Sequence, residues 1–174
     1  DPFEPDDDPG SATDVGVLVP GTPLNLGTVP APTVNNGATL SIDGDGDEDY
    51  FLFSISAQSS LTATITPRGL NYDSSPQVGG SCTSGNFINS LFMADLNGEL
   101  LDADGVTVLA AASAQPSGGT ESVFFPSLDA GSYYIRVLEG DAPTQSQLYQ
   151  LTLAAAPPTP FPAAAEPGGL VKNR

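Results

Sequence analysis

Asp43-Gly-Asp-Gly-Asp-Glu-Asp49-Tyr50-Phe-Leu-Phe-Ser-Ile55 is the stretch that decides the fold, because an acidic repeat leads directly into a strand pattern. After Tyr50, the apolar residues Phe51, Phe53 and Ile55 share one face of the expected strand, and serines lie on the other. This two-residue period is typical of a half-buried strand. The carboxylates are thus held where a strand begins, and they repel one another unless a cation lies among them. Ca²⁺ prefers oxygen ligands and is the cation we expect.

The same two-residue period recurs along the chain, and no segment has a convincing helical period. Residues 67–86 have no period and are predicted to form a long loop insert. We predict an all-β fold: an antiparallel, jelly-roll-like β-sandwich of about eight short strands. The expected strands are 13–19, 38–42, 50–57, 61–66, 88–95, 106–112, 121–125, 132–138 and 148–154, with 50–57 and 61–66 forming a hairpin, Asn97-Gly98 a turn, and the last two strands a closing pair.

Composition divides the chain into one domain and a tail. Residues 1–154 form the predicted sandwich domain, and its first part, 1–37, is an irregular arm in which closely spaced prolines exclude a helix. Residues 155–174 are rich in Pro and Ala and are expected to be a semi-rigid linker or tail. The chain starts without Met and without a signal peptide, so we expect a mature product or an excised domain.

Charge limits the partners. The 174 residues include 21 Asp and Glu but only 4 Lys and Arg, which gives a net charge of −17. Such a field opposes binding to nucleic acid or to an anionic membrane. The sequence has no apolar run of the length that crosses a bilayer, so we expect no membrane insertion. Many Gly, Pro, Ser and Thr with few Lys are typical of a secreted bacterial protein, extracellular or at the cell surface.

Catalytic motifs are missing from the sequence. There is no histidine, so neither a Ser-His nor a Cys-His dyad can form, and zinc cannot be held by histidine ligands. Neither a phosphate-binding G-x-x-x-x-G-K-[ST] loop nor a G-x-S-x-G nucleophile elbow occurs. We therefore predict that the protein is not an enzyme.

The acidic repeat is not an EF-hand. Asp43, Asp45 and Asp47 match positions 1, 3 and 5 of such a loop, but Glu48 replaces the glycine at position 6. Ser54 replaces the glutamate at position 12, and a strand follows instead of a helix. The alternative to a calcium site is a solvated acidic turn.

A second acidic cluster lies at the N-terminus, and with it the chain resembles the bacterial pre-peptidase C-terminal domain family, which includes the collagen-binding domains of clostridial collagenases. The order and spacing of four motifs over about residues 3–154 carry this resemblance. They are Glu4-Pro-Asp6-Asp7 with Ser11-Ala-Thr13, Ile42 to Phe51, Leu91-Phe-Met-Ala-Asp-Leu-Asn-Gly98, and Leu128-Asp-Ala-Gly131-Ser-Tyr133-Tyr134-Ile-Arg-Val137 with Tyr149-Gln-Leu151.

The resemblance implies a sandwich without catalytic activity that is appended to secreted hydrolases or surface proteins. Several members of the family bind Ca²⁺ between the N-terminal segment and the loop that opens the acidic strand. One family aspartate falls on Gly46 here, so Asp45 or Asp47 is expected to take its place. The implied metal ligands are Glu4, Asp6, Asp7, Ser41 and Asp49, with Asp45 and Asp47 as the replacements.

These inferences favour a calcium-stabilised, non-catalytic accessory module that binds or positions a protein or an extracellular polymer. The alternative is a structural subunit of an extracellular or cell-surface assembly, which makes protein–protein contacts through residues 67–86 and the tail. A carbohydrate-binding domain is a third reading, although the sequence has no Trp for stacking. Cys82 is the single cysteine. It is either an inert thiol or forms an intermolecular disulfide, because the chain offers no second cysteine to pair with.

Overall fold

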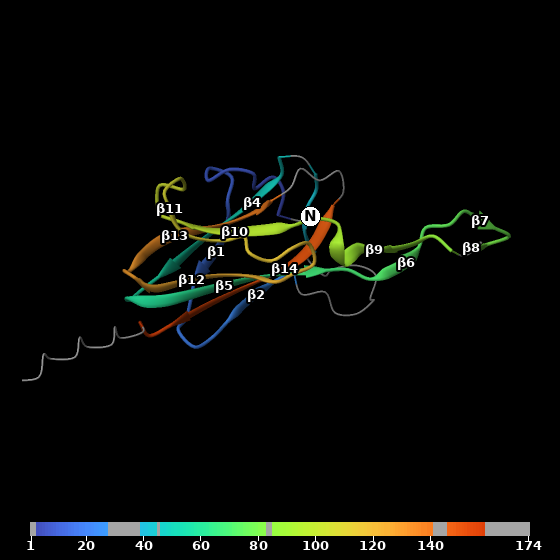
Figure 1. Ribbon diagram of the computed structural model, residues 1–174. Helices are drawn as coiled ribbons and strands as arrows, with labels where there is room; N and C mark the ends of the chain where they lie inside the picture. The colour runs from blue at the N-terminus through green and yellow to red at the C-terminus, as the bar shows by residue number, and fades with distance from the viewer. Residues whose placement is uncertain (1–2, 28–38, 45, 83–84, 141–145, 159–174) are drawn as a thin grey trace, which may run out of the picture.

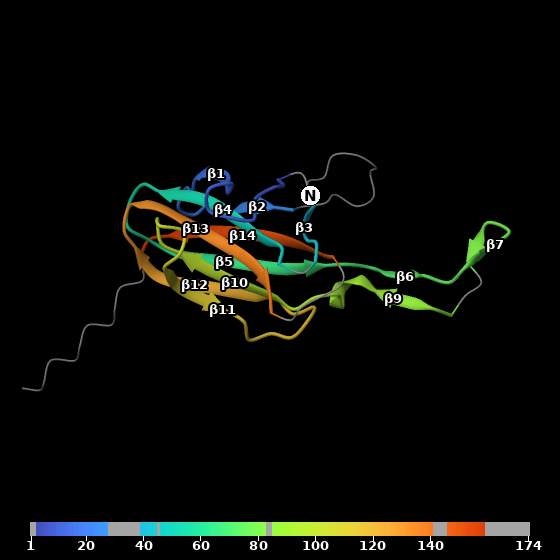
Figure 2. The same ribbon diagram turned by 90° about the horizontal axis from the view of Figure 1, so that it is seen from above.

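Two β-sheets pack face to face, and a narrow two-stranded arm projects from one end of them (Figures 1 and 2). The computed structural model describes residues 3–27, 39–44, 46–82, 85–140 and 146–158. Within these ranges the regular elements are strands and a single 3-10 turn. The predicted all-β sandwich is therefore confirmed.

The first sheet has the order β1-β4-β13-β10-β11. Its neighbours are antiparallel except for β1 and β4, which run parallel. The strands are β1 (Thr13–Val17), β4 (Glu48–Ile55), β13 (Gly131–Glu139), β10 (Leu96–Leu101) and β11 (Val108–Ala112).

The second sheet has the order β12-β5-β14-β2, and β3 also pairs with β14. All of its pairs are antiparallel. The strands are β12 (Glu121–Leu128), β5 (Ser59–Arg68), β14 (Gln147–Ala156), β2 (Leu24–Leu26) and β3 (Leu40–Ile42).

The core lies between the inner faces of the two sheets. Alternate residues of each strand point inward, so Phe51 and Phe53 of β4 meet Leu151 and Leu153 of β14, and all four are fully buried. Each such side chain contributes about 1.5–3 kcal/mol by leaving water. The inward faces predicted for β4, β5, β13 and β14 are confirmed.

Two predicted connections are wrong. β4 and β5 do not form a hairpin: they lie in different sheets, and the chain between them crosses from one sheet to the other. The strands β13 and β14 likewise share the core from opposite sheets instead of pairing with each other. An inward apolar face is the same whether the next strand is a neighbour or lies across the core, so the pattern alone could not separate these cases.

Asn97-Gly98 is not a turn, because it lies inside β10. A Cβ atom on Gly98 would come within 2.3 Å of Cδ1 of Ile65 in the facing sheet. The glycine thus serves close packing of the two sheets, and its turn-like sequence is misleading.

Residues 67–86 do not form an irregular loop. β5 continues to Arg68, and the chain then forms a ribbon in which β6 pairs with β9 and β7 with β8. The segment predicted as strand 88–95 contains the end of β9 and the 3-10 turn η1. At the other end of the domain, β14 continues two residues into the predicted tail. The ribbon elements are β6 (Asn71–Asp73), β7 (Gln77–Val78), β8 (Ser81–Cys82), β9 (Phe87–Asn89) and η1 (Ser90–Phe92).

Candidate metal centre

The N-terminal segment is held against the start of β4. The backbone N–H of Tyr50 donates to the carbonyl of Asp6 over 2.9 Å, and the rings of Phe3 and Phe51 make an edge-to-face contact with centroids 6.4 Å apart. Beyond this segment, β1 pairs with β4. These contacts bring the acidic N-terminus beside the residues that open β4.

The other segment that forms the centre is the loop that leads from β3 in one sheet to β4 in the other. Gly44 and Gly46 have φ values of 124° and 90°, which residues with a Cβ atom rarely adopt. The backbone N–H of Asp43 donates to the carboxylate of Asp47, so the loop itself orients that side chain. The glycines of the acidic repeat thus allow the turn, and its aspartates supply the oxygens.

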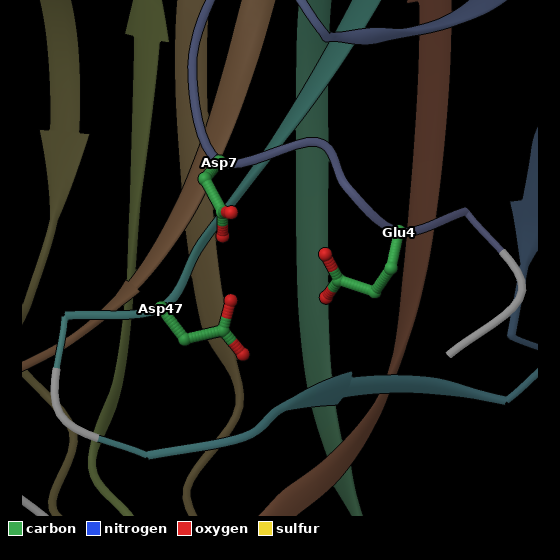
Figure 3. A group of neighbouring side chains, drawn as sticks. All are labelled: Glu4, Asp7 and Asp47. Carbon is green, nitrogen blue, oxygen red and sulfur yellow. The ribbon is translucent and has the colours of Figure 1, made fainter.

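Five carboxylates from these two segments form two overlapping groups. In the first group, one oxygen from each of Glu4, Asp7 and Asp47 lies within 4.8 Å of the others. Figure 3 shows these three side chains pointing toward a common space. The second group joins Glu4 with Asp6 and Asp49 within the same limit. Oxygens that surround one Ca²⁺ at about 2.3–2.6 Å are separated by distances of this size.

Two of these carboxylates lie in the protein interior. Asp6 and Asp49 are 0% exposed, and Oδ1 of each has no hydrogen-bond partner among the described residues. Asp49 lies two residues before Phe51 and so shares the core-facing side of β4. Buried charges are normally paired or bound to a metal, so these orphaned oxygens are unusual. They fit a centre that is completed by a cation.

Burial and mutual repulsion disfavour the charged forms. Burial raises the pKa of Asp49 to about 8, with further contributions from the charges of Asp6, Asp47 and Glu4. Burial likewise raises the pKa of Asp6 and of Asp47 to about 6, again with repulsion from neighbouring carboxylates. At an effective dielectric of about 20, two unit charges 5 Å apart repel by about 3 kcal/mol. Without a cation the centre therefore favours protonation.

Hydrogen bonds from two other side chains orient the buried pair. The hydroxyl of Tyr149, in β14 of the opposite sheet, donates to Oδ2 of Asp49. The hydroxyl of Thr13 donates to Oδ2 of Asp6 over 3.3 Å. In each carboxylate the other oxygen, Oδ1, is left for a further ligand. In the sequence, the alternation of Tyr149 with Leu151 indicates a core position, and its spacing of 100 positions from Asp49 gives no signal of their contact.

Protein cations do not neutralise the centre in the described ranges. Arg68 and Arg136 are the Lys or Arg residues found there. Arg136 forms ion pairs with Glu48 and Glu99 and lies over the ring of Tyr50, 5.8 Å from its centroid. Arg68 is exposed at the end of β5 and is not among the charges that shift the pKa values of the centre.

The structure brings together five of the seven predicted ligands: Glu4, Asp6, Asp7, Asp47 and Asp49. Ser41 is buried in β3, where it pairs with Leu148. Asp45 lies outside the described residues, and Asp47, the other predicted replacement for the family aspartate that falls on Gly46, lies in the first of the two carboxylate groups. The identity of the metal remains a prediction, as do the roles of all seven residues as ligands.

Comparisons with known proteins concern the fold. No family model matches the chain, and no curated protein matches it. Similar solved structures include the pre-peptidase C-terminal domain of a collagenase from Bacillus anthracis, with 13% identity, a TM-score of 0.47, and coverage of 82% of this chain and 93% of that one. They also include Aeromonas hydrophila PliG, a periplasmic inhibitor of g-type lysozyme, with 12% identity, a TM-score of 0.38, and coverage of 83% and 98%.

The first of these structures is a pre-peptidase C-terminal domain, the family that the sequence motifs resemble. A likeness at this level of identity tells nothing about what the chain binds. No helix in the described residues has the length and apolarity needed to cross a bilayer.

Proposed function

We propose that this protein is a secreted, non-catalytic β-sandwich module that calcium stabilises and that binds or positions a protein or polymeric partner. The observation that supports calcium most directly is the buried pair Asp6 and Asp49. Both are fully buried, both leave one oxygen without a hydrogen-bond partner in the described part of the chain, and both belong to a carboxylate group of metal-binding size.

The chemistry of the centre favours calcium over magnesium. Ca²⁺ takes six to eight oxygens in flexible geometry, whereas Mg²⁺ requires a near-ideal octahedron at about 2.0–2.1 Å. Carboxylates from an N-terminal segment and a glycine-containing loop form an adaptable set. Because Glu4 and Asp7 are exposed, the centre opens to solvent. Extracellular modules with such sites bind calcium with Kd values of about 10⁻⁴–10⁻³ M, which suits a secreted protein.

Calcium would hold the N-terminal segment and the start of β4 together. The N-terminal segment carries Glu4, Asp6 and Asp7, and β4 with its preceding loop carries Asp47 and Asp49. A cation that binds both sets converts their repulsion into attraction and fixes the segment on the first sheet. Binding energy of this kind adds directly to the free energy of unfolding.

Isothermal titration calorimetry with CaCl₂ and with MgCl₂ tests the metal. We expect calcium to bind with at least tenfold higher affinity than magnesium, and the stoichiometry gives the number of ions that the two overlapping groups hold. Asp43→Asn is a matched control, because Asp43 belongs to the same acidic repeat but to neither carboxylate group. The absence of a binding isotherm for calcium at millimolar concentration would refute the metal proposal.

Co-sedimentation with insoluble polymers, such as fibrillar collagen and cellulose, tests the partner. The protein should sediment with one of these polymers in calcium and less strongly after the metal is removed. Calcium binding without any polymer binding would support the metal centre and leave protein partners as the class to test next. The two parts of the proposal therefore succeed or fail separately.

A further inference from the structure

One side of the sandwich is open between β1 and β2, which are terminal strands of their sheets in the described part of the chain. In both views these two strands lie on the same side of the body (Figures 1 and 2). A hollow of about 140 Å³ lies here, lined chiefly by apolar side chains, among them Val17, Leu18, Val19, Pro23 and Leu24. An apolar cavity of about 150 Å³ holds one benzene molecule, so this hollow has the size for a single phenyl side chain.

The hollow is uncharged and open to solvent. Val17 and Val19 are 61% and 59% exposed, while Leu18 between them is buried in the core. Residues 15–27 include no Asp, Glu, Lys or Arg, although the chain has a net charge of −17. A charged group would lose its hydration on entering the hollow without gaining an opposite charge. The hollow therefore fits a neutral, apolar group.

The end of β14 brings the following residues to this hollow. The backbone N–H of Gly21, in the turn that joins β1 to β2, donates to the carbonyl of Ala155 over 2.9 Å. On the other side of β14, the hydroxyl of Ser60 donates to the carbonyls of Ala156 and Pro157, each 3.4 Å away. The chain therefore leaves the domain beside the turn between β1 and β2.

The sequence that follows suits the hollow. Pro157-Pro158-Thr159-Pro160-Phe161-Pro162 is uncharged, and Phe161 is the only aromatic residue in 155–174. Closely spaced prolines favour polyproline II, which rises about 3.1 Å per residue and repeats every three residues. Pro158 and Phe161 then share one edge, and Pro158 is half-buried.

The distances allow Phe161 to reach the hollow. It comes five residues after Ala156, so in polyproline II it lies up to about 15 Å beyond the end of β14. Val19 and Pro23 are each two residues from Gly21, and two residues of chain span at most about 7 Å. The residues that line the hollow are thus nearer to the end of β14 than Phe161 can extend.

We infer that Phe161 inserts its ring into the hollow between β1 and β2 of its own chain, with the flanking prolines against Val17 and Val19. A segment tethered this closely presents its side chain at a millimolar effective concentration, which favours it over a free ligand or a second copy. Prolines on both sides reduce the conformational freedom that is lost on binding. Docking covers the open side of the core and fixes the direction in which the chain leaves the domain. The inference does not depend on the metal centre.

Methyl NMR spectra of the full chain test the insertion. In the unsubstituted protein, nuclear Overhauser contacts should join the ring protons of Phe161 to the methyl groups of Val17 and Val19. An aromatic ring shifts the resonances of methyl groups that it contacts, so Phe161→Ser should move these signals. The methyl signals of Val106, which is exposed outside the hollow, should stay in place.

Fluorescence provides a second measurement. The chain has no Trp, so Phe161→Trp supplies a single reporter, whose emission should lie at shorter wavelength than in the urea-unfolded chain. Because partial burial of an aromatic side chain favours the docked form about tenfold, acrylamide should quench the reporter roughly fivefold less than in urea. Adding Val17→Asp and Val19→Asp should remove this protection. Val106→Asp and Val108→Asp add the same charge outside the hollow and should leave it intact.

Three results would overturn the inference. They are the absence of the Overhauser contacts, a reporter as accessible as in urea, and protection that Val17→Asp and Val19→Asp leave intact. Protection that fades on dilution from about 100 to 1 µM would place the ring in a second copy and equally overturn docking within one chain. Because Val17 and Val19 are largely exposed, their replacement should leave the circular dichroism spectrum unchanged. If that variant does not fold, the Overhauser contacts of the unsubstituted chain decide the question.

Discussion

The stabilising effect of calcium should depend strongly on pH. At the centre the pKa of Asp49 is raised to about 8, and those of Asp6 and Asp47 to about 6, mainly by burial. Calcium binds ionised carboxylates, so it must displace the protons that these groups hold. Lowering the pH therefore weakens calcium binding well above the usual range of an aspartate.

These pKa values set the size of the effect. If the three groups titrate independently, the protons to be displaced weaken the apparent calcium affinity roughly 200-fold between pH 8 and pH 6. At saturating calcium this is a loss of about 3 kcal/mol of stabilisation. For a domain of this size, the difference in Tm between the calcium-bound and metal-free protein should shrink by about 6–12 °C.

The metal-free protein should respond to pH in the opposite direction from an ordinary acidic protein. The pKa of Asp49 in the folded state, about 8, lies above its ordinary value of 3.8. The folded state therefore binds more protons than the unfolded state between these values, and stability falls as pH rises through this window. Below about pH 4 both states are protonated and the cost disappears.

Differential scanning calorimetry at pH 6, 7 and 8 measures both effects. The metal-free samples should be stripped on a chelating resin, because the affinity of soluble chelators itself changes with pH. We expect the Tm of the metal-free protein to fall from pH 6 to pH 8 while the difference produced by excess calcium grows. A difference in Tm that is equal at pH 6 and pH 8, or larger at pH 6, would refute the reasoning.

Three further predictions follow from single residues. Asp49→Asn should abolish most of the calcium response in calorimetry and, in metal-free protein at pH 8, raise the Tm, because the buried charge of Asp49 is removed; Asp43→Asn should do neither. Tyr149→Phe keeps the ring in the core but removes the hydroxyl that orients Asp49, so calcium affinity measured by titration calorimetry should fall about 10–100-fold, and an unchanged affinity would contradict the role of this hydroxyl. Gln147→Ala leaves buried backbone groups at the base of the arm, such as the N–H of Met93, without partners and should cost about 2–4 kcal/mol in urea unfolding, whereas an unchanged midpoint would show that water replaces the amide.

The sequence predicted the layers of the fold better than their connections. Alternation in β4 identified the buried side chains Phe51, Phe53 and Ile55. It could not show that β4 pairs with β1 and β13 and not with β5, because both faces of the core present the same pattern. Pairing between distant strands depends on contacts that no local period records.

The ribbon formed by β6, β7, β8 and β9 was not predicted, for a different reason. Its strands are two or three residues long, which is too short for a period to be recognised. Gln147, a polar residue more than fifty positions beyond Ala94, anchors its base. Gly69 allows a close approach of the backbone there, because a Cβ atom at this position would lie 2.2 Å from the backbone nitrogen of Leu91. Neither residue stands out in the sequence.

The acidic residues show why charge can be more informative than hydrophobicity about a site. An acidic segment that merely kept the protein soluble would lie at the surface, as Asp43 does. The sequence distinguishes Asp49 from such surface residues, because Asp49 lies two residues before Phe51 and therefore faces the core. A folded domain tolerates an ionised carboxylate there only with a counter-charge, and Arg136, the cation nearest in the sheet register, pairs with Glu48 and Glu99 instead. The buried carboxylate of Asp49 must therefore be neutralised either by a proton or by a metal ion. The calorimetric experiment measures the pH range in which the metal replaces the proton.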